Sequence, residues 1–286
     1  MKKRILTTIA LAFLFLGGLS VLLYPAVSNY INSMSQSRVI EGYSLALAQL
    51  GEFDYGDILE AAREYNRRLS ANAARFAMTE EELEIYRGIL DFSGTGVIGT
   101  LRIDAINVNL PIYLGTEEDT LQVGIGHVEG SSLPIGGPGS HSVISGHRGL
   151  PSSTLLTDAD KLLEGDVFVL SILNETMYYE IDQRAIVLPE NLDHLGIDPN
   201  EDYCTLVTCT PIGVNTHRLL LRGRRIFPET GETEIVSPGN RNFRADARLA
   251  GAAVQYAIAA VPVLIIAFVF MLIKNSKILK GQKGRN

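Results

Sequence analysis

The sequence predicts a mainly β domain, a small closed barrel or sandwich, held between a membrane helix at each end of the chain. Seven or eight short segments rich in β-branched and aliphatic residues follow one another over about 130 residues. An Ala-, Glu- and Arg-rich stretch before them predicts helices. Each end of the chain carries an uncharged apolar run of 23 residues.

The two apolar runs, residues 5–27 and 251–273, are predicted to cross a membrane, because about 20 apolar helical residues span a bilayer. An alternative for the first run is a cleaved signal peptide, but its length and the absence of an Ala-x-Ala site at its end favour an uncleaved anchor. Basic residues precede the first run at 2–4 and follow the second over 274–285. Because such residues stay in the cytoplasm, both termini are expected there, with residues 28–250 outside the cell.

The outer part of the chain is strongly acidic. All 32 acidic residues but only 17 of the 25 basic ones lie in 28–250, which gives this part a net charge of −15. Nucleic-acid binding is therefore not expected, since a phosphate backbone requires Lys and Arg. The expected order is a cytoplasmic tail with the first membrane helix (1–27), a helical neck (28–92), the β domain (93–228), a polar linker (229–250), the second membrane helix (251–273) and a basic cytoplasmic tail (274–286).

The neck is predicted to be helical over residues 38–90. The stretch "REYNRRLSANAARFAMTEEELEIYRGIL" at its end is rich in strong helix formers. Thr79 and Glu82 have the spacing of a capping box and predict that a helix begins near residue 80.

The β domain begins where Gly, Val, Ile and Asn replace the helix formers. The hairpin "DVFVLSILNETMYYEIDQRAIVL" consists of two runs of β-forming residues around a turn. The predicted strands lie near 97–103 and 106–113, at 140–146, on both sides of Asn174-Glu175 in that hairpin, and in "YCTLVTC" and "THRLLLRGRRIF".

The only two cysteines, Cys204 and Cys209, are not expected to form a disulfide. Their separation of five residues places them on opposite faces of one strand, about 16 Å apart along an extended chain. A disulfide requires Cα atoms within about 7 Å of each other. No CxxC pair exists, so a structural zinc site is not expected either. A free thiol outside the cell favours a reactive role.

Cys209 is a candidate nucleophile at the end of its strand. A thiolate is strongly nucleophilic, and a positive neighbour lowers the pKa of a thiol. The turn after Cys209 contains Pro211, Gly213 and Asn215, so the next strand returns beside it and brings Arg218 within reach. A guanidinium is always charged and suits an oxyanion. The alternatives are a buried, inert thiol and an ordinary surface arginine.

A general acid and base would come from one of five histidines. His147 follows a strand in the Gly-rich segment "ISGHRGLPSS", in the kind of loop where catalytic groups concentrate. The spacing alone does not distinguish it from the others, which are His127, His141, His194 and His217.

The segment "TLVTCTPIGVNTHRLLLRG" resembles the signature of sortases, the cysteine transpeptidases of Gram-positive surfaces, with their TLxTC segment and downstream Arg. "LPIYLGT" and "GIGHVEGSSLPIGGPGSHSVISGHRGLPSSTLLTDADKLLEGDVF" resemble class C, the pilin-polymerising branch, as does the layout with a helix at each end. The likeness is close over about residues 85–228.

The resemblance implies an eight-stranded closed β-barrel and three catalytic residues. It assigns Cys209 as nucleophile, His147 as acid and base, and Arg218 as the group that stabilises the oxyanion. Cys204 is then a buried strand residue. The same resemblance leaves structural roles to His127, His141 and His217.

The implied reaction is acyl transfer at the cell membrane. The Cys209 thiolate would cleave an LPxTG-like sorting signal between Thr and Gly, and a lysine amine of the next pilin subunit would resolve the thioacyl enzyme, building covalent pili. The expected partners are pilin subunits with such a signal, an acceptor lysine or a cell-wall precursor, and the membrane, without any cofactor or metal.

The chain departs from class C at the lid, a loop that commonly carries an Asp-Pro-aromatic triplet. No such triplet is present, and "ARF" at 74–76 lies nearest to the expected place. We therefore expect residues 70–80 to lean over the site, with Arg75 and Phe76 as lid residues and Phe76 as the plug.

Two other functions remain open from the sequence. One is a housekeeping sortase that attaches proteins to a peptidoglycan precursor. The other is a membrane-tethered binding module without enzymatic activity, against which the intact set of Cys209, His147 and Arg218 argues.

Overall fold

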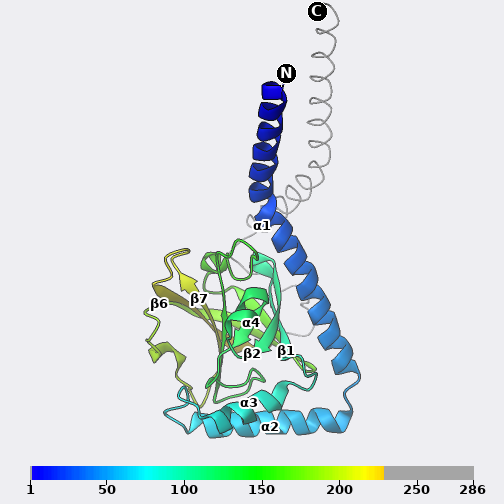
Figure 1. Ribbon diagram of the computed structural model, residues 1–286. Coiled ribbons are helices and arrows are strands. Elements are labelled where there is room, and N and C mark those ends of the chain that lie inside the picture. Colours follow the sequence, from blue (N-terminus) through cyan, green and yellow to red (C-terminus); the bar gives the residue numbers. More distant parts are fainter. Residues whose placement is uncertain (1, 229–286) are drawn as a thin grey trace, which may run out of the picture.

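The computed structural model of the protein describes residues 2–228. The expected polar linker, second membrane helix and basic tail lie outside these residues. Eight strands form a closed barrel in the order β1-β2-β3-β4-β7-β8-β6-β5, which confirms the predicted fold class (Figure 1). The strands are β1 Val97–Ile103, β2 Val108–Leu114, β3 Ile125–His127, β4 Ser140–Gly146, β5 Val167–Ile172, β6 Glu175–Val187, β7 Asp202–Thr210 and β8 His217–Ile226.

Two strand pairs in the barrel, β2–β3 and β4–β7, are parallel, and the others are antiparallel. Short 3-10 turns occupy Asp104–Ile106, Ala159–Lys161 and Asp193–Leu195. The first of these turns delays β2 to Val108, two residues later than the sequence predicts. The three-residue strand β3 was not predicted, because it is too short to show a period.

Side chains alternate between the barrel interior and its outer face, as the period of two requires. On β7, Cys204 and Leu206 belong to the hydrophobic core, whereas Cys209 is half-buried on the opposite face. Both cysteines are free. The sequence prediction that strand parity separates the two thiols is therefore confirmed.

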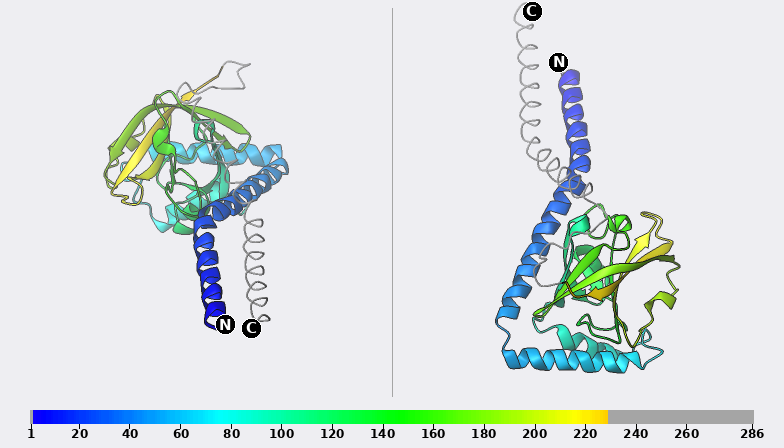
Figure 2. Two further views of the ribbon diagram at one scale, coloured as in Figure 1. Left: turned by 90° about the horizontal axis from the view of Figure 1, so that it is seen from above. Right: turned by 180° about the vertical axis from the view of Figure 1, so that it is seen from behind.

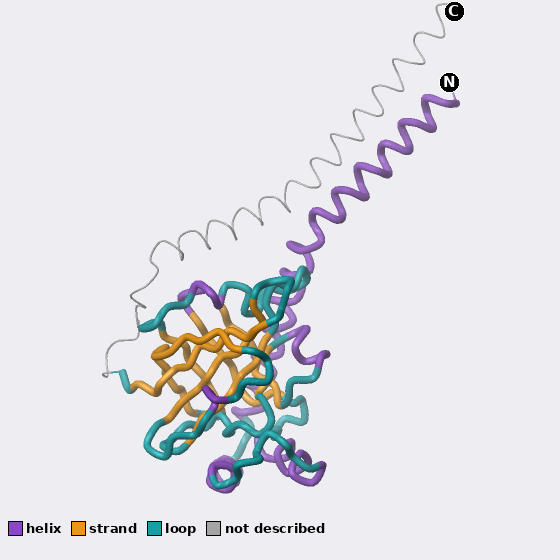
Figure 3. Tube along the Cα trace, turned by 90° about the vertical axis from the view of Figure 1, so that its left-hand side faces the viewer, coloured by secondary structure: helices purple, strands orange, loops and turns teal. Residues whose placement is uncertain are grey.

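Within residues 2–228, four helices accompany the barrel: α1 Lys2–Ala48, α2 Glu52–Ser70, α3 Glu80–Leu90 and α4 Glu118–Val123. The capping box is present at α3, where the Thr79 side chain accepts from the Glu82 N–H and the Glu82 carboxylate accepts from the Thr79 N–H. Helices α2 and α3 lie across the end of the barrel that is remote from the N-terminus (Figures 1 and 3).

Helix α1 is one continuous element that crosses the predicted boundary between membrane helix and neck. It contains a stretch that is long and apolar enough to cross a membrane. Pro25 lies inside it, and the helix bends between its N-terminal part and the part beside the barrel (Figure 2). Tyr43 attaches the part of α1 beside the barrel, because its hydroxyl donates to the Ile98 carbonyl at 2.9 Å and accepts from the Leu173 N–H at 2.8 Å.

Candidate active site

The candidate nucleophile and the candidate oxyanion group lie side by side across two strands. Strand β8 pairs with β7 so that Cys209 is opposite Arg218, as the predicted hairpin requires. Directly opposite residues of an antiparallel pair have Cβ atoms about 5 Å apart. Leu219 and Leu221 point into the core, so Arg218 points to the outer face, which is also the face of Cys209.

His147 joins this pair through the parallel strands β4 and β7. Their register runs from Ser140–Asp202 to Ser145–Val207, and two further residues on each strand bring His147 level with Cys209. The hydroxyl of Thr208 donates to the Gly146 carbonyl at 2.7 Å and ties the two strand ends together. The structure thus brings all three predicted residues to one end of one face.

This end of the outer face is open, while its other end is covered. Thr205 and His141 are only 1% exposed, whereas the side chain of His147 is 26% exposed. Cys209 and Arg218 are half-buried. Cys209 and His147 are therefore both partly exposed to a polypeptide that approaches the strand ends, while the Nε2 atom of His147 is itself buried.

Arg218 and His147 each have further polar neighbours at the open end of this face. The Arg218 guanidinium donates to the carbonyls of Asn215 and His217, both at 3.2 Å, so the turn that follows Cys209 also orients the arginine. The Nε2 atom of His147 lies 3.5 Å from the carboxylate of Glu118 on α4 and has no hydrogen-bond partner within residues 2–228. Sequence reasoning missed Glu118, because nothing local relates α4 to the loop of His147.

The other histidines differ in their surroundings. His127 is fully buried, with Nδ1 2.8 Å from the Tyr86 hydroxyl and Nε2 2.8 Å from the Ser132 carbonyl. Since a carbonyl only accepts, Nε2 carries the proton and Nδ1 accepts from Tyr86. Burial lowers the pKa of His127 to about 4, so it is neutral at physiological pH. His217 lies at the edge, 2.9 Å from the Thr216 hydroxyl.

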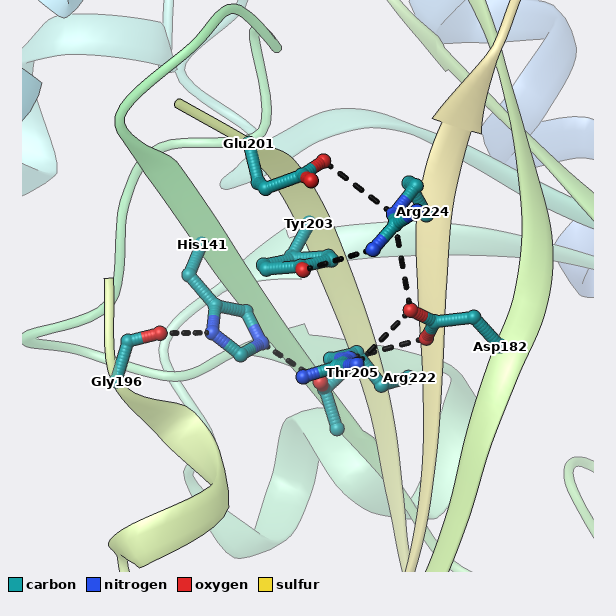
Figure 4. A network of polar contacts seen from close by, with 8 residues as sticks. All are labelled: His141, Asp182, Gly196, Glu201, Tyr203, Thr205, Arg222 and Arg224. Atoms are coloured by element: carbon teal, nitrogen blue, oxygen red, sulfur yellow. Dashed lines mark hydrogen bonds and ion pairs between the residues drawn. The ribbon is translucent and has the colours of Figure 1, made fainter. Parts of the chain in front are cut away.

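His141 belongs to a polar network on the covered part of the outer face (Figure 4). Its Nδ1 donates to the Gly196 carbonyl at 2.7 Å, and its Nε2 lies 2.7 Å from the Thr205 hydroxyl. Burial lowers the pKa of His141 to about 4. The contact to Gly196 holds the β6–β7 loop, residues 188–201, against the strands that carry the site.

The same network contains an ion pair that a β-bulge creates. The register of β6 against β8 shifts between Ile181 and Gln183, and the bulged residue Asp182 accepts two hydrogen bonds from Arg222 at 3.0 and 2.9 Å. The Arg222 guanidinium also stacks on the ring of Tyr203 at 4.3 Å. The sequence showed no signal for this pair, because a bulge is set by pairing between distant strands.

Arg75 spans two loops next to this network. Its guanidinium donates to the carbonyls of Gly130, at 3.0 Å, and Leu195, and it lies over the ring of Phe76 at 4.4 Å. The backbone of Phe76 packs on Gly130, where an added Cβ would come within 2.9 Å of the Phe76 Cα. Residues 71–79, here called the lid segment, therefore cross the outer face between the β3–β4 and β6–β7 loops.

The lid segment is remote from the thiol, so the predicted plug by Phe76 over Cys209 is not seen. The turn at Gly130 is followed by Ser132, whose N–H donates to the backbone carbonyl of His141 at the start of β4. His147 follows six residues later, about 20 Å along an extended strand. The physical reason is the anchor of Arg75, which draws the segment toward the start of β4. A lid role for Arg75 and Phe76 stays a prediction.

Comparison with known proteins shows which family the chain belongs to. Residues 101–226 match the sortase domain, and the chain is 48% identical to sortase C1 from Streptococcus agalactiae, covering 67% of this chain and 100% of that one with a TM-score of 0.64. This chain belongs to the sortase family. A sortase C from Streptococcus pneumoniae, whose structure is described in terms of catalysis and pilin substrate specificity, is 36% identical, with 67% and 97% covered and a TM-score of 0.59.

Among curated proteins, this sortase is similar to sortase D from Bacillus subtilis, with 30% identity over 131 residues, or 45% of this chain. The chain spans 63% of the length of that relative. The relatives named sortase C agree with the class that the motifs of this sortase indicate.

Proposed function

We propose that this sortase is a membrane-anchored cysteine transpeptidase of the pilin-polymerising class. The observation that carries the proposal is the alignment of Cys209 with Arg218 across β7–β8 and with His147 at the end of β4. Three side chains of the right chemistry, on one face and at one strand level, are what acyl transfer through a thioester requires.

In the proposed reaction the Cys209 thiolate attacks the carbonyl carbon between Thr and Gly of an LPxTG-like signal. The oxygen of the tetrahedral intermediate carries the negative charge, and Arg218 stabilises it. The C–N bond breaks as His147 gives its proton to the leaving glycine amine, which leaves a thioester on Cys209. His147 then takes a proton from the incoming lysine amine as that amine attacks the thioester carbonyl. The C–S bond breaks and releases the Cys209 thiolate.

The neighbours of these groups support this division of roles. The Glu118 carboxylate lies 3.5 Å from His147 Nε2, where it can orient the imidazole ring. The two backbone carbonyls that bind one nitrogen of Arg218 leave its other N–H groups for the substrate, because a guanidinium has five donors.

We also propose that the chain is held in the cell membrane through α1, with residues 28–250 outside the cell and both termini in the cytoplasm. The apolar stretch in α1 and the basic residues before it support this orientation. The run 251–273 is proposed as a second membrane helix on its composition alone. A pilin lysine is favoured over a wall precursor as the acceptor by the similarity to a sortase C described with pilin substrates.

The lid segment is proposed to close the covered part of the outer face rather than the thiol itself. Arg75 binds one carbonyl on the β3–β4 loop and one on the β6–β7 loop, so it links the two loops. Opening the segment would free the β6–β7 loop to move away from His141 and Thr205.

The test is cleavage of an LPxTG peptide by the full chain in detergent, with mass spectrometry of the trapped thioacyl enzyme. We expect cleavage and an acyl adduct on Cys209, with both lost in Cys209→Ala. Cleavage that survives this substitution would overturn the assignment of the nucleophile. Polymer formation with a pilin that carries an acceptor lysine distinguishes the pilus polymerase from a wall-anchoring enzyme, which would act on the precursor instead.

A further inference from the structure

The loop that carries His147 is fastened to α1 directly after its apolar stretch. Asn29 of α1 accepts from the N–H and the hydroxyl of Thr154 at 2.8 and 2.9 Å. The amide of Asn32 donates to the Ser152 carbonyl at 2.8 Å. The spacing of three residues places both asparagines on one face of the helix. The loop after His147, residues 148–157, is therefore held by three hydrogen bonds to one helix face.

The position of these bonds along α1 fixes their depth relative to a bilayer. The apolar run ends at residue 27 and is about 35 Å long at 1.5 Å per residue, enough for the hydrocarbon core. Asn29 and Asn32 then lie about 3 and 8 Å beyond its end, or less where the helix is tilted. The headgroup layer is roughly 5–8 Å thick on each side. The loop after His147 thus lies at the depth of the headgroups.

The turn after Cys209 is joined to this loop. The side chain of Ile212 packs on Gly149, where an added Cβ would come within 2.5 Å of the isoleucine methyl. The β7–β8 loop, residues 211–216, therefore lies beside the loop that α1 holds. Figure 1 shows this end of the barrel turned toward the N-terminal arm of α1, and α2 and α3 at the other end.

The surface of the two loops suits a membrane interface. The sequence "PIGVNT" has no charge, and its two apolar side chains are exposed, Ile212 to 47% and Val214 to 64%. The only charged residue of "RGLPSSTLLT" is Arg148, whose side chain is 3% exposed and bound to Asp160 at 3.0 Å. The far end of the barrel differs, because α2 alone carries eight charged residues in "EFDYGDILEAAREYNRRLS".

We propose that the face formed by the loops 148–157 and 211–216 rests on the lipid headgroups, so that the mouth of the active site opens at the membrane surface. The inference rests on the proposed anchoring of α1 and adds an orientation that anchoring alone does not define. A barrel on a flexible tether could present any face to the bilayer, whereas the bonds of Asn29 and Asn32 select this one. A substrate held in the same membrane would then meet Cys209 close to the plane of the headgroups.

The chain contains no tryptophan, so single tryptophans report on depth. The full chain is placed in phosphatidylcholine vesicles with or without a spin label on the headgroup, as Val214→Trp, Pro151→Trp and, as matched control, Ile85→Trp. Ile85 is 52% exposed on α3, at the end remote from the N-terminus. We expect the label to reduce the emission of Val214→Trp and Pro151→Trp roughly twofold, and to leave Ile85→Trp unchanged.

The outcomes separate this inference from the function on which it rests. Flotation of the vesicles reports anchoring, and peptide cleavage in detergent reports the transpeptidase. If the chain floats and cleaves but the two loop tryptophans are quenched no more than Ile85→Trp, the orientation is wrong and the proposed function stands. A chain that does not float overturns both the anchor and the orientation. The two loop positions are independent, so misfolding of one variant leaves the other as the test.

Discussion

Removing the hydroxyl of Thr208 is a direct test of how the fold aligns the Cys209 thiol with the His147 imidazole. It is 3% exposed and donates to the Gly146 carbonyl at 2.7 Å, one residue before His147 and one before Cys209 on the two strands. In Thr208→Val a methyl replaces the hydroxyl and the bond is lost. A neutral hydrogen bond contributes about 1 kcal/mol, and an acceptor left buried and unpaired costs about 1–3 kcal/mol. We expect a loss of about 1–2 kcal/mol, or roughly 2–8 °C in Tm for a domain of this size.

The effect on catalysis should exceed the effect on stability. Without the bond the ends of β4 and β7 are free to separate, and a misplacement of about 1 Å can reduce a rate up to a hundredfold. We expect kcat/KM for an LPxTG peptide to fall about tenfold in Thr208→Val. Thr208→Ser keeps the hydroxyl and loses one methyl, worth about 0.8 kcal/mol, and serves as control. Equal kcat/KM in the two variants, at equal folded fraction by circular dichroism, would refute the reasoning.

Three further predictions concern the thiols, a buried histidine and the ion pair at the bulge. Iodoacetamide should alkylate Cys209 but not Cys204 in the folded chain, because burial, with Asp202 nearby, raises the pKa of Cys204; peptide mapping that finds both modified equally would contradict this. The Tm should fall as pH drops from about 6.5 to about 4, because the unfolded chain then binds protons at His127 and His141 that the two buried side chains do not bind in the folded chain. His127→Gln should make this slope shallower and leave the contribution of His141, and an unchanged slope would exclude His127. Asp182→Asn should cost about 1–3 kcal/mol at neutral pH by weakening the bond to Arg222, with Asp193→Asn as a surface control, and equal Tm values for the two would contradict a stabilising role.

Local patterns predicted much of this fold because the signals were local. The capping box of Thr79 and Glu82 defines the start of α3 without reference to the rest of the chain. The odd spacing of Cys204 and Cys209 separates their faces in any strand. The hairpin from Cys209 to Arg218 joins neighbours in the sequence. In each case the physical cause lies within about ten residues, so the sequence carries it directly.

The features that escaped prediction depend on contacts between distant segments. Glu118 approaches His147 only because α4 follows β2 and contacts β3, whose first residue, Ile125, pairs with Gly146 at the end of β4. Asp182 reaches Arg222 through a bulge in a strand 40 residues away. Arg75 was predicted near the thiol, but the carbonyls of Gly130 and Leu195 hold it at the other end of the same face. These partners are 55 and 120 residues away in the sequence, beyond any periodicity argument.

The parallel pairing of β4 and β7 gives the site its geometry. Parallel strands end at the same edge of a sheet, so a residue after β4 and a residue at the end of β7 become neighbours. An antiparallel β8 then adds a third residue opposite the second. All three must point outward, and a slip of one residue on β7 would turn Cys209 into the core and Thr208 outward. The bonds that fix this register, from Thr208 to Gly146 and from His141 to Thr205, join the same two strands at both ends. Polar residues that take no part in the chemistry therefore determine whether the three that do can meet.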